Sequence, residues 1–281
     1  VEVLGPVSDI DRILHEHQAI GAVVSLASVS QGEVNSLTRR LTENGFHVAL
    51  SSTLRDIDIE RLRPQALDGR TMIYVEPVMR GGWRAVAKRA FDLVLASSIL
   101  LLSAPILLAA IIAIRLDSPG PVFFKQVRVG RHGETFRLIK LRTMGVDAEE
   151  RRADLHHLNE ADGALFKIRE DPRITKVGRV LRKYSIDELP QLFNVLHGAM
   201  SMVGPRPALP DEVAKWDDEV VERLRVLPGL TGMWQVQGRS DTSFETYKRL
   251  DLYYVDNWSL AHDLRICVRT VGVVLTGHGA A

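Results

Sequence analysis

A stretch of 22 residues without a single charge, from Leu93 to Ile114, dominates the hydrophobic pattern of the chain. As a helix with a rise of about 1.5 Å per residue it would reach roughly 33 Å, which is long enough to cross a bilayer. Pro105 lies in its middle, where a proline removes a helical hydrogen bond and bends the axis, and Ser103 is close enough to bond the freed backbone. The pattern predicts a membrane helix that breaks at Ser103 and Pro105.

Basic residues flank both ends of this apolar stretch. Those before it are Arg84, Lys88 and Arg89, and those after it are Arg115, Lys125, Arg128 and Arg131. Because positively charged flanks stay on the cytoplasmic side, both ends are expected on the same face of the membrane. We therefore predict a re-entrant helix over residues 88–116, which enters the bilayer, turns at Pro105 and leaves again. A buried core helix of a soluble protein is the alternative, although so long an uncharged stretch is unusual in soluble domains.

Upstream of this helix, residues 1–79 alternate between strand-like and helix-like segments. The pattern predicts strands at 1–4, 22–26 and 47–50, a first helix around residues 10–14, and a second helix that begins with the capping-box spacing of 30–33 and ends at Gly45. This order is typical of a small parallel α/β domain. No G-x-G-x-x-G motif follows the first strand, which favours a regulatory or packing role over nucleotide binding.

Downstream of Asp117 the pattern is mixed. We predict a hairpin with arms at 122–124 and 134–139, and helices at 147–158, from Asp171 onwards and from Pro210 through Leu224. Together with the apolar helix, these elements predict a membrane-associated α+β domain over residues 80–281.

Composition excludes several function classes. A net charge of +1 with 25% charged residues argues against a nucleic-acid binder, which usually carries a strongly basic face. Cys267 is the only cysteine, so there is no disulfide framework, and the nine histidines lack the spacing of a zinc site. The chain opens without a methionine or signal-peptide pattern, and we expect that segments upstream of Val1 are missing.

Candidate chemistry concentrates in the segment 185–194, where two adjacent carboxylates, Asp187 and Glu188, follow a basic stretch that contains Arg182. Arg206 lies between two prolines, so its guanidinium can be presented to a phosphate with little loss of backbone freedom. Such a cluster suits a divalent metal and a phosphorylated substrate. Adjacent acids on a helix point about 100° apart, so we expect split roles, one attacking or holding the reacting group and the other binding metal. A solvated helix surface is the alternative for this pair.

Further polar residues are candidates for substrate binding. Lys140 and Arg142 follow the second arm of the hairpin, and the glycine- and amide-rich segment 229–239 contains Gln235 and Arg239. This segment is suited to wrapping a nucleotide or sugar, and a tight loop around a core tryptophan is the alternative. The cations Lys140, Arg142 and Arg182 are equally compatible with ordinary surface or lipid-headgroup contacts.

Taken together, these segments resemble the bacterial sugar transferase family, the monotopic polyprenyl-phosphate phosphoglycosyl transferases. The matching blocks, in order, are Lys88–Asp92, the apolar helix with Pro105, Gln126–Gly130, Lys140–Met144, Ser185–Leu192, Val203–Pro207 and Gly229–Arg239. Residues 1–79 look like the Rossmann-like α/β domain, here incomplete at its N-terminus, that precedes the catalytic part in larger members, which carry transmembrane helices still earlier. Many members have serine directly before the helix-breaking proline, whereas Ala104 intervenes here.

The resemblance implies transfer of a sugar 1-phosphate from a UDP-sugar, with glucose or galactose favoured, to undecaprenyl or another polyprenyl phosphate. UMP is released, in the first membrane step of exopolysaccharide, capsule or O-antigen synthesis at the cytoplasmic face of the bacterial inner membrane. It implies that Asp187 is the nucleophile that forms a covalent phosphosugar intermediate and that Asp187 and Glu188 support Mg²⁺. The implied substrate-binding residues are Lys140, Arg142, Arg182, Arg206, Gln235 and Arg239.

The expected partners are therefore the UDP-sugar, polyprenyl phosphate, membrane lipid and a second copy in a homodimer, and no nucleic acid is expected. Two alternatives stay open. One is a membrane-bound Mg²⁺-dependent phosphohydrolase, and the other is a non-enzymatic, membrane-docked assembly module.

Overall fold

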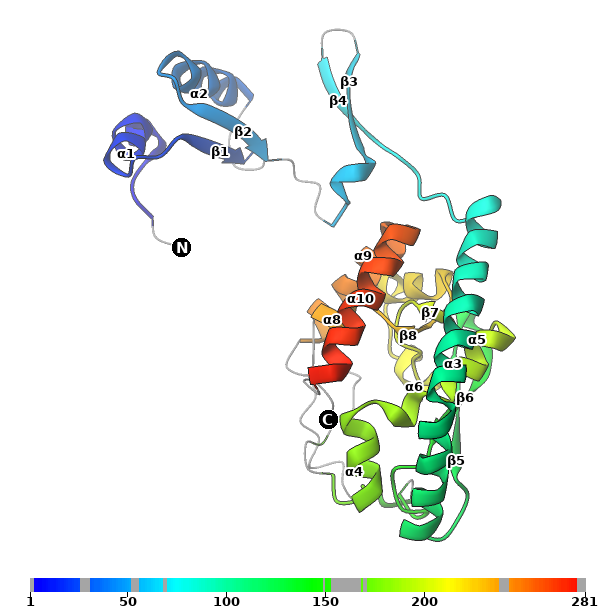
Figure 1. The fold of residues 1–281 in the computed structure, drawn as a ribbon. Helices are drawn as coiled ribbons and strands as arrows, with labels where there is room; N and C mark the ends of the chain where they lie inside the picture. Colours follow the sequence, from blue (N-terminus) through cyan, green and yellow to red (C-terminus); the bar gives the residue numbers. More distant parts are fainter. Residues whose placement is uncertain are drawn as a thin grey trace. The chain divides into compact units, whose positions relative to one another are not determined.

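The structure is a computed structural model in which residues 3–25, 31–51, 56–67, 70–148, 150–152, 168, 171–237 and 243–276 are described. The chain divides into two compact units, Val1–Ile57 and Asp58–Ala281. The border lies upstream of the one placed at residue 79 from the sequence, because the segment after Asp58, with its hairpin, is grouped with the second unit. Figure 1 shows the helices and strands of both units.

The first unit is built on one βαβ motif. Its elements are η1 (Val7–Asp9), α1 (Ile10–Glu16), β1 (Gly21–Ser25), α2 (Gln31–Glu43) and β2 (His47–Ser51). The strands β1 and β2 are parallel, and Val34, Leu37 and Leu41 of α2 fall on one helical face that is buried in the unit's core. This confirms the predicted strand–helix–strand order. The strand predicted at 1–4 is wrong for Val3 and Leu4, which are exposed and belong to no strand.

The second unit mixes helices with two-stranded sheets. Its elements are η2 (Ile59–Arg61), β3 (Leu62–Leu67), β4 (Arg70–Val75), α3 (Trp83–Asp117), β5 (Phe123–Val129), η3 (Arg131–Gly133), β6 (Thr135–Leu141), η4 (Glu150–Arg152), α4 (Lys176–Lys183), η6 (Ile186–Glu188), α5 (Gln191–His197), β7 (Ser201–Val203), α6 (Pro210–Val213), α7 (Asp218–Val221), η7 (Glu222–Arg225), β8 (Gly229–Thr231), α8 (Met233–Gln237), α9 (Phe244–Asp256) and α10 (Leu260–Thr276). The pairs β3–β4 and β5–β6 are antiparallel, and β7–β8 is parallel. The predicted hairpin is β5–β6, and the prediction of a mixed helix-and-strand domain is confirmed.

Three of the predicted helices differ in extent. The helix from Pro210 through Leu224 is divided into α6, α7 and η7, because the Asp217 side chain accepts a hydrogen bond from Val220 N at 2.8 Å and starts a new helix there. The helix from Asp171 begins only at Lys176. Of the helix predicted at 147–158, residues 147 and 148 lie in a turn and residues 150–152 form η4, while residues 149 and 153–158 lie outside the described residues.

The long apolar helix α3 runs without interruption through Pro105, so the break predicted at Ser103 and Pro105 is not seen within this helix. It buries a narrow stripe of residues, namely Asp92, Ala96, Ser103, Ala110 and Ile114. Elsewhere it is open, and Leu101 and Leu102 are 76% and 77% exposed. A core helix of a soluble protein would be mostly covered, so this surface favours contact with lipid. Ser103 Oγ donates to Leu100 O at 3.4 Å. Pro105 has no N–H to donate to the carbonyl four residues earlier, which is that of Leu101, the residue next to Leu100.

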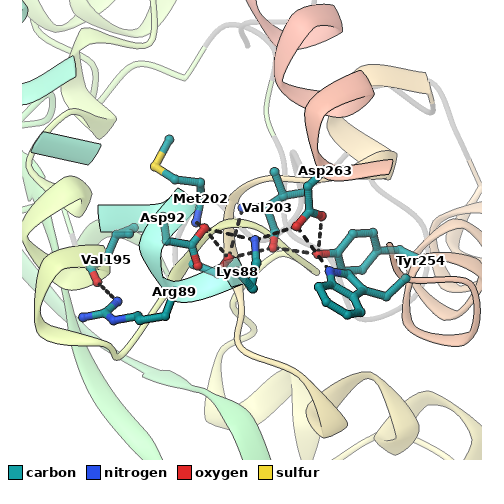
Figure 2. Close-up of polar contacts among 10 residues, drawn as sticks. Lys88, Arg89, Asp92, Val195, Met202, Val203, Tyr254 and Asp263 are labelled. Carbon is teal, nitrogen blue, oxygen red and sulfur yellow. Dashed lines mark hydrogen bonds and ion pairs between the residues drawn. The ribbon is translucent and has the colours of Figure 1, made fainter. Parts of the chain in front are cut away.

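A buried polar network holds the first half of α3 to the core of the unit (Figure 2). Lys88 Nζ lies 3.0 Å from Asp92 Oδ1 and 2.8 Å from Asp263 Oδ2 of α10. The Tyr254 hydroxyl of α9 donates to the other oxygen of Asp263 at 2.8 Å. Burial raises the pKa of Asp263, and Lys88 only partly offsets this effect. Because three helices meet in this network, α3 is anchored by charged groups as well as by apolar packing.

The neighbouring residue Arg89 completes the anchor. Its guanidinium donates to Val195 O at 2.7 Å and to Leu196 O at 2.8 Å, which are carbonyls at the C-terminal end of α5 (Figure 2). A cation at this end of a helix satisfies carbonyls that have no partner within the helix. The block Lys88–Asp92 of the sequence resemblance is thus the segment that joins α3 to the rest of the unit.

Gly178 of α4 provides a test of how closely this unit is packed. A Cβ at Gly178 would lie 2.1 Å from Thr143 O, which is backbone and cannot move aside. We expect Gly178→Ala to cost about 1–3 kcal/mol of the free energy of unfolding, as overpacking does. All four tryptophans lie in the second unit, so the tryptophan fluorescence of the solubilised protein would report its unfolding midpoint.

The matched control is Gly272→Ala in α10, where a Cβ would meet nothing within 4 Å. This variant is expected to be neutral or to gain up to about 1 kcal/mol from the higher helix propensity of alanine. Equal unfolding midpoints for the two variants would contradict the close approach of α4 to Thr143.

Candidate active site

The two adjacent carboxylates lie in η6, a single turn between α4 and α5. Ser185 precedes this turn in a left-handed conformation (φ 53°), which is uncommon outside glycine and reverses the chain at the end of α4. Asp187 is buried, with 6% of its surface exposed, whereas the Glu188 side chain is 34% exposed. The solvated-surface alternative therefore does not hold for Asp187. Residues on a 3₁₀ turn project about 120° apart, so the two carboxylates point in different directions.

Their surroundings push the pKa values of the two acids in opposite directions. Burial raises the pKa of Asp187, Lys140 opposes this, and the charge of Glu188 adds to the rise. Burial also acts upward on the pKa of Glu188, but Lys140 and Arg206 outweigh it and lower that pKa. Lys140 Nζ lies 2.5 Å from Glu188 Oε1. Neighbouring acids with separated pKa values are suited to different chemical roles.

Arg182 approaches the pair from α4. Its Nε donates to Thr143 Oγ1 at 2.9 Å, and burial lowers its pKa although the charge of Asp187 acts in the other direction. The segment that carries Thr143 is in turn held by a buried ion pair, Arg173 to Asp171 at 2.6 Å, which the sequence analysis did not single out. Arg182 is thus oriented by a neutral partner, and its charge faces the buried acid.

Arg206 acts on Glu188 and is held at several points. Its Nη1 lies 3.2 Å from Glu212 Oε2, its carbonyl accepts from Arg223 Nη2 at 3.3 Å, and the Asp251 carboxylate contacts its backbone N–H. Arg223 and Asp251 form an ion pair at 2.5 Å in which each side chain is 1% exposed. The ring of Tyr247 lies 4.4 Å from the Arg223 guanidinium. This buried pair therefore fixes the backbone of the predicted phosphate-binding arginine.

Arg128 is a further cation near the pair, and the sequence analysis named it only as a membrane flank. Its Nε and Nη2 donate to Gln126 Oε1 at 3.1 and 2.6 Å, and its Nη1 donates to Pro207 O at 2.9 Å. Burial and the nearby charge of Arg206 lower its pKa to about 10. Gln126 and Arg128 are two positions apart and therefore lie on the same face of β5. This spacing, within one of the blocks that carry the family resemblance, was a signal in the sequence that could have identified Arg128.

Four cations thus surround two carboxylates, and they are Lys140, Arg128, Arg182 and Arg206. The excess of positive charge in a partly buried site favours an anionic ligand, and arginines suit phosphate oxygens in particular. The structure brings Asp187, Glu188, Lys140, Arg182 and Arg206 together.

The other candidates lie differently. Arg142 is buried and donates to Ser118 O at 2.8 Å, to Ser118 Oγ at 3.0 Å and to Pro119 O, so its guanidinium closes the loop after α3. Gln235 Nε2 donates to Leu230 O at 3.2 Å across its own segment. Arg239 lies outside the described residues. Substrate contacts by these three residues stay predictions.

The fit of Mg²⁺ depends on the ligands that a substrate adds. Within the described part of the chain, no three His, Cys, Asp or Glu side chains converge as a metal site. Mg²⁺ is usually held by one or two carboxylates together with substrate phosphates and water. Asp187 and Glu188 do not form a complete protein cage, so a metal ion held by them would need further ligands from a bound substrate.

Comparison with known proteins places these residues in a family. The family model for bacterial sugar transferases matches residues 83–277. The galactosyl transferase CpsE of Streptococcus agalactiae is 42% identical over 224 residues, which cover 79% of this chain and 50% of that protein. The exopolysaccharide production protein ExoY of Rhizobium meliloti is 43% identical over 199 residues, covering 69% of this chain and 88% of that protein.

A third relative is the UDP-glucose:undecaprenyl-phosphate glucose-1-phosphate transferase of Caulobacter vibrioides, 43% identical over 201 residues that cover 69% of this chain and 71% of that protein. The chain thus spans half of one of these relatives and most of the other two. The family match covers η6, the four surrounding cations and all of α3. The resemblance noted from the sequence is confirmed, and this chain belongs to the bacterial sugar transferase family.

Proposed function

We propose that this protein transfers a sugar 1-phosphate from a UDP-sugar to undecaprenyl or another polyprenyl phosphate and releases UMP, as an early membrane step of exopolysaccharide, capsule or O-antigen synthesis. The observation that carries the proposal is the place of the carboxylate pair. Ile186, directly before Asp187, packs against the buried hydrophobic cluster that includes Ala110 and Ile114 of α3. A buried acid ringed by cations therefore lies close to a helix whose other faces expose apolar side chains, where a lipid phosphate and a soluble diphosphate can meet. The names of the relatives favour galactose or glucose as the sugar.

In the proposed first step a carboxylate oxygen of Asp187 attacks the sugar-bearing phosphorus. The bond from this phosphorus to the bridging oxygen breaks, the electron pair leaves with UMP, and a phosphosugar remains on Asp187. A phosphate oxygen of the polyprenyl phosphate then attacks the same phosphorus and releases the Asp187 carboxylate. The cations Lys140, Arg182 and Arg206 neutralise the diphosphate and the departing UMP. When bound by Asp187, Glu188 and the diphosphate, Mg²⁺ supplies further neutralisation of this charge.

The proposal is tested by UMP release from UDP-glucose, UDP-galactose and other UDP-sugars, with and without Mg²⁺ and with and without polyprenyl phosphate. We expect release that depends on both the lipid and the metal. Free sugar phosphate in the absence of lipid would favour the phosphohydrolase, and no release with any sugar would favour the non-enzymatic module. The expected homodimer, the Rossmann-like character of the first unit and the lack of nucleic-acid binding stay predictions.

The proposed placement is re-entrant at the cytoplasmic face of the inner membrane. Since α3 is one continuous helix of 35 residues, its two ends can share one face only if the axis bends at Pro105 within the bilayer. In a Cys267→Ser background, we expect single cysteines at Gly81 and Leu116, before and after the apolar stretch, both to be labelled from the cytoplasmic side. Labelling from opposite sides would instead indicate a spanning helix.

The pH dependence of turnover follows from the raised pKa of Asp187. Only the ionised carboxylate attacks phosphorus, so kcat/KM should fall as pH drops through a pKa above the ordinary value of 3.8. Lys140 lowers this pKa, and Lys140→Gln is therefore expected to move the acid limb to higher pH. Lys125→Gln removes the same charge from an exposed position of β5 and should leave the limb in place. An unmoved limb in Lys140→Gln would rule out control by this cation.

A further inference from the structure

The outer face of α4 has an unusual composition. Its exposed residues follow the spacing of one helical face and are Lys176, Arg179, Val180, Lys183 and Tyr184. Val180 and Tyr184, four residues apart, are 55% and 44% exposed. The face thus combines an aliphatic and an aromatic side chain with three cations.

The remaining faces of α4 are already occupied. Leu181 and Val177 pack in the hydrophobic cluster that includes Ala110 and Ile114 of α3, and Arg182 is directed to Thr143 and the carboxylate pair. This helix therefore connects the lipid-facing helix with the candidate active site, and its third face is exposed.

Among the described residues, the cations of this face have no acidic partners. Throughout those ranges, no carboxylate forms an ion pair with Lys176, Arg179 or Lys183, and the Lys183 ammonium instead lies 5.4 Å from the ring centroid of Tyr184. Unpaired lysines and arginines that accompany exposed apolar and aromatic side chains are typical of surfaces that bind anionic lipid headgroups. The positive charge of the face, together with its exposed aliphatic and aromatic side chains, identifies the occupant as an anionic bilayer surface.

We propose that the outer face of α4 docks on anionic lipid headgroups, with Arg179 and Lys183 at lipid phosphates and Val180 and Tyr184 at the boundary with the acyl chains. The inference rests on the membrane placement of α3 in the proposed function. Each cation near an anionic membrane surface contributes on the order of a fivefold change in the docking equilibrium. Docking of α4 would hold Arg182 and the carboxylate pair at the level of the lipid phosphates.

The test uses the full chain with Cys267→Ser, reconstituted in lipid nanodiscs that contain either zwitterionic lipid alone or a fraction of phosphatidylglycerol. A fluorophore on a cysteine introduced by Val180→Cys reports contact with a headgroup-bound quencher. We expect stronger quenching in the anionic discs, and Arg179→Gln with Lys183→Gln should reduce it to the level of the zwitterionic discs. The matched double change Lys215→Gln with Arg225→Gln removes the same charge from exposed positions elsewhere and should leave it unaltered.

A second fluorophore, introduced by Leu102→Cys on α3, separates this inference from the proposed membrane placement. If it is quenched by acyl-chain quenchers while the fluorophore at position 180 is equally quenched in both kinds of disc, docking of α4 is refuted and the placement of α3 stands. If neither fluorophore is quenched, the membrane placement fails and the docking proposal fails with it.

Discussion

Asp187→Asn is expected to abolish lipid-dependent UMP release, with a loss of about 10⁴-fold or more, as is typical when a covalent nucleophile is removed. The amide keeps the shape of the side chain but has no carboxylate oxygen with which to attack phosphorus. The measurement is UMP release from the preferred UDP-sugar in the presence of polyprenyl phosphate. Turnover in Asp187→Asn at a rate close to that of the unchanged protein would refute the covalent mechanism.

Loss of folding is the main competing explanation, and the electrostatics of the site address it. Burial raises the pKa of Asp187, so the folded protein holds this proton more tightly than the unfolded chain does. Stability therefore falls as pH rises through the raised pKa, and at neutral pH the ionised Asp187 opposes folding. The uncharged amide that Asp187→Asn introduces removes that opposition.

Asp187→Asn should consequently have an unfolding midpoint no lower than that of the unchanged protein. A midpoint that falls together with activity would mean that the loss reflects unfolding.

Removal of one partner of the Arg223–Asp251 pair is expected to cost about 3–5 kcal/mol of the free energy of unfolding of the second unit. Both side chains are 1% exposed, so Asp251→Leu leaves a buried guanidinium without its counter-charge. Trp216 stacks on this guanidinium at 4.7 Å and places a fluorescent reporter at the site of the change. The measurement is chemical unfolding followed by tryptophan fluorescence.

Two controls give this prediction its specificity. Arg225→Gln breaks an exposed pair, Arg225 to Glu222 at 2.9 Å, and is expected to cost less than about 1 kcal/mol. The double variant Arg223→Met with Asp251→Leu should recover most of the stability, because apolar replacement of a buried pair is often neutral. If Asp251→Leu lowered the free energy of unfolding no more than Arg225→Gln does, the buried pair would contribute little to stability.

The recovered double variant also tests whether the pair positions Arg206. In this variant the backbone of Arg206 would lose its contacts with Arg223 and Asp251, while the protein stays folded. We expect the KM for the UDP-sugar to rise with a smaller change in kcat, since Arg206 is proposed to bind phosphate. An unchanged KM in the folded double variant would confine the pair to a structural role.

Arg142 shows why local pattern is insufficient for site residues. It follows Lys140 by two positions, and the same spacing within a strand would place both side chains on one face. The last register pair of the hairpin is Phe123↔Leu141, so Arg142 lies beyond the ladder and its guanidinium reaches the loop after α3. Where the strand ends depends on its pairing partner, which the local sequence does not reveal.

What the sequence determined by itself was the set of features carried by residues close together in the chain. These are the uncharged length of α3, the βαβ order of the first unit, and the carboxylate pair with Arg182 close by, whereas Lys140 was linked to the pair only through the family resemblance. The tertiary structure alone decided that Arg128 joins them, that Arg223 and Asp251 clamp Arg206, and that the two acids differ in pKa. Burial and Coulomb interactions depend on distances between segments far apart in the chain, and only the packed fold sets those distances.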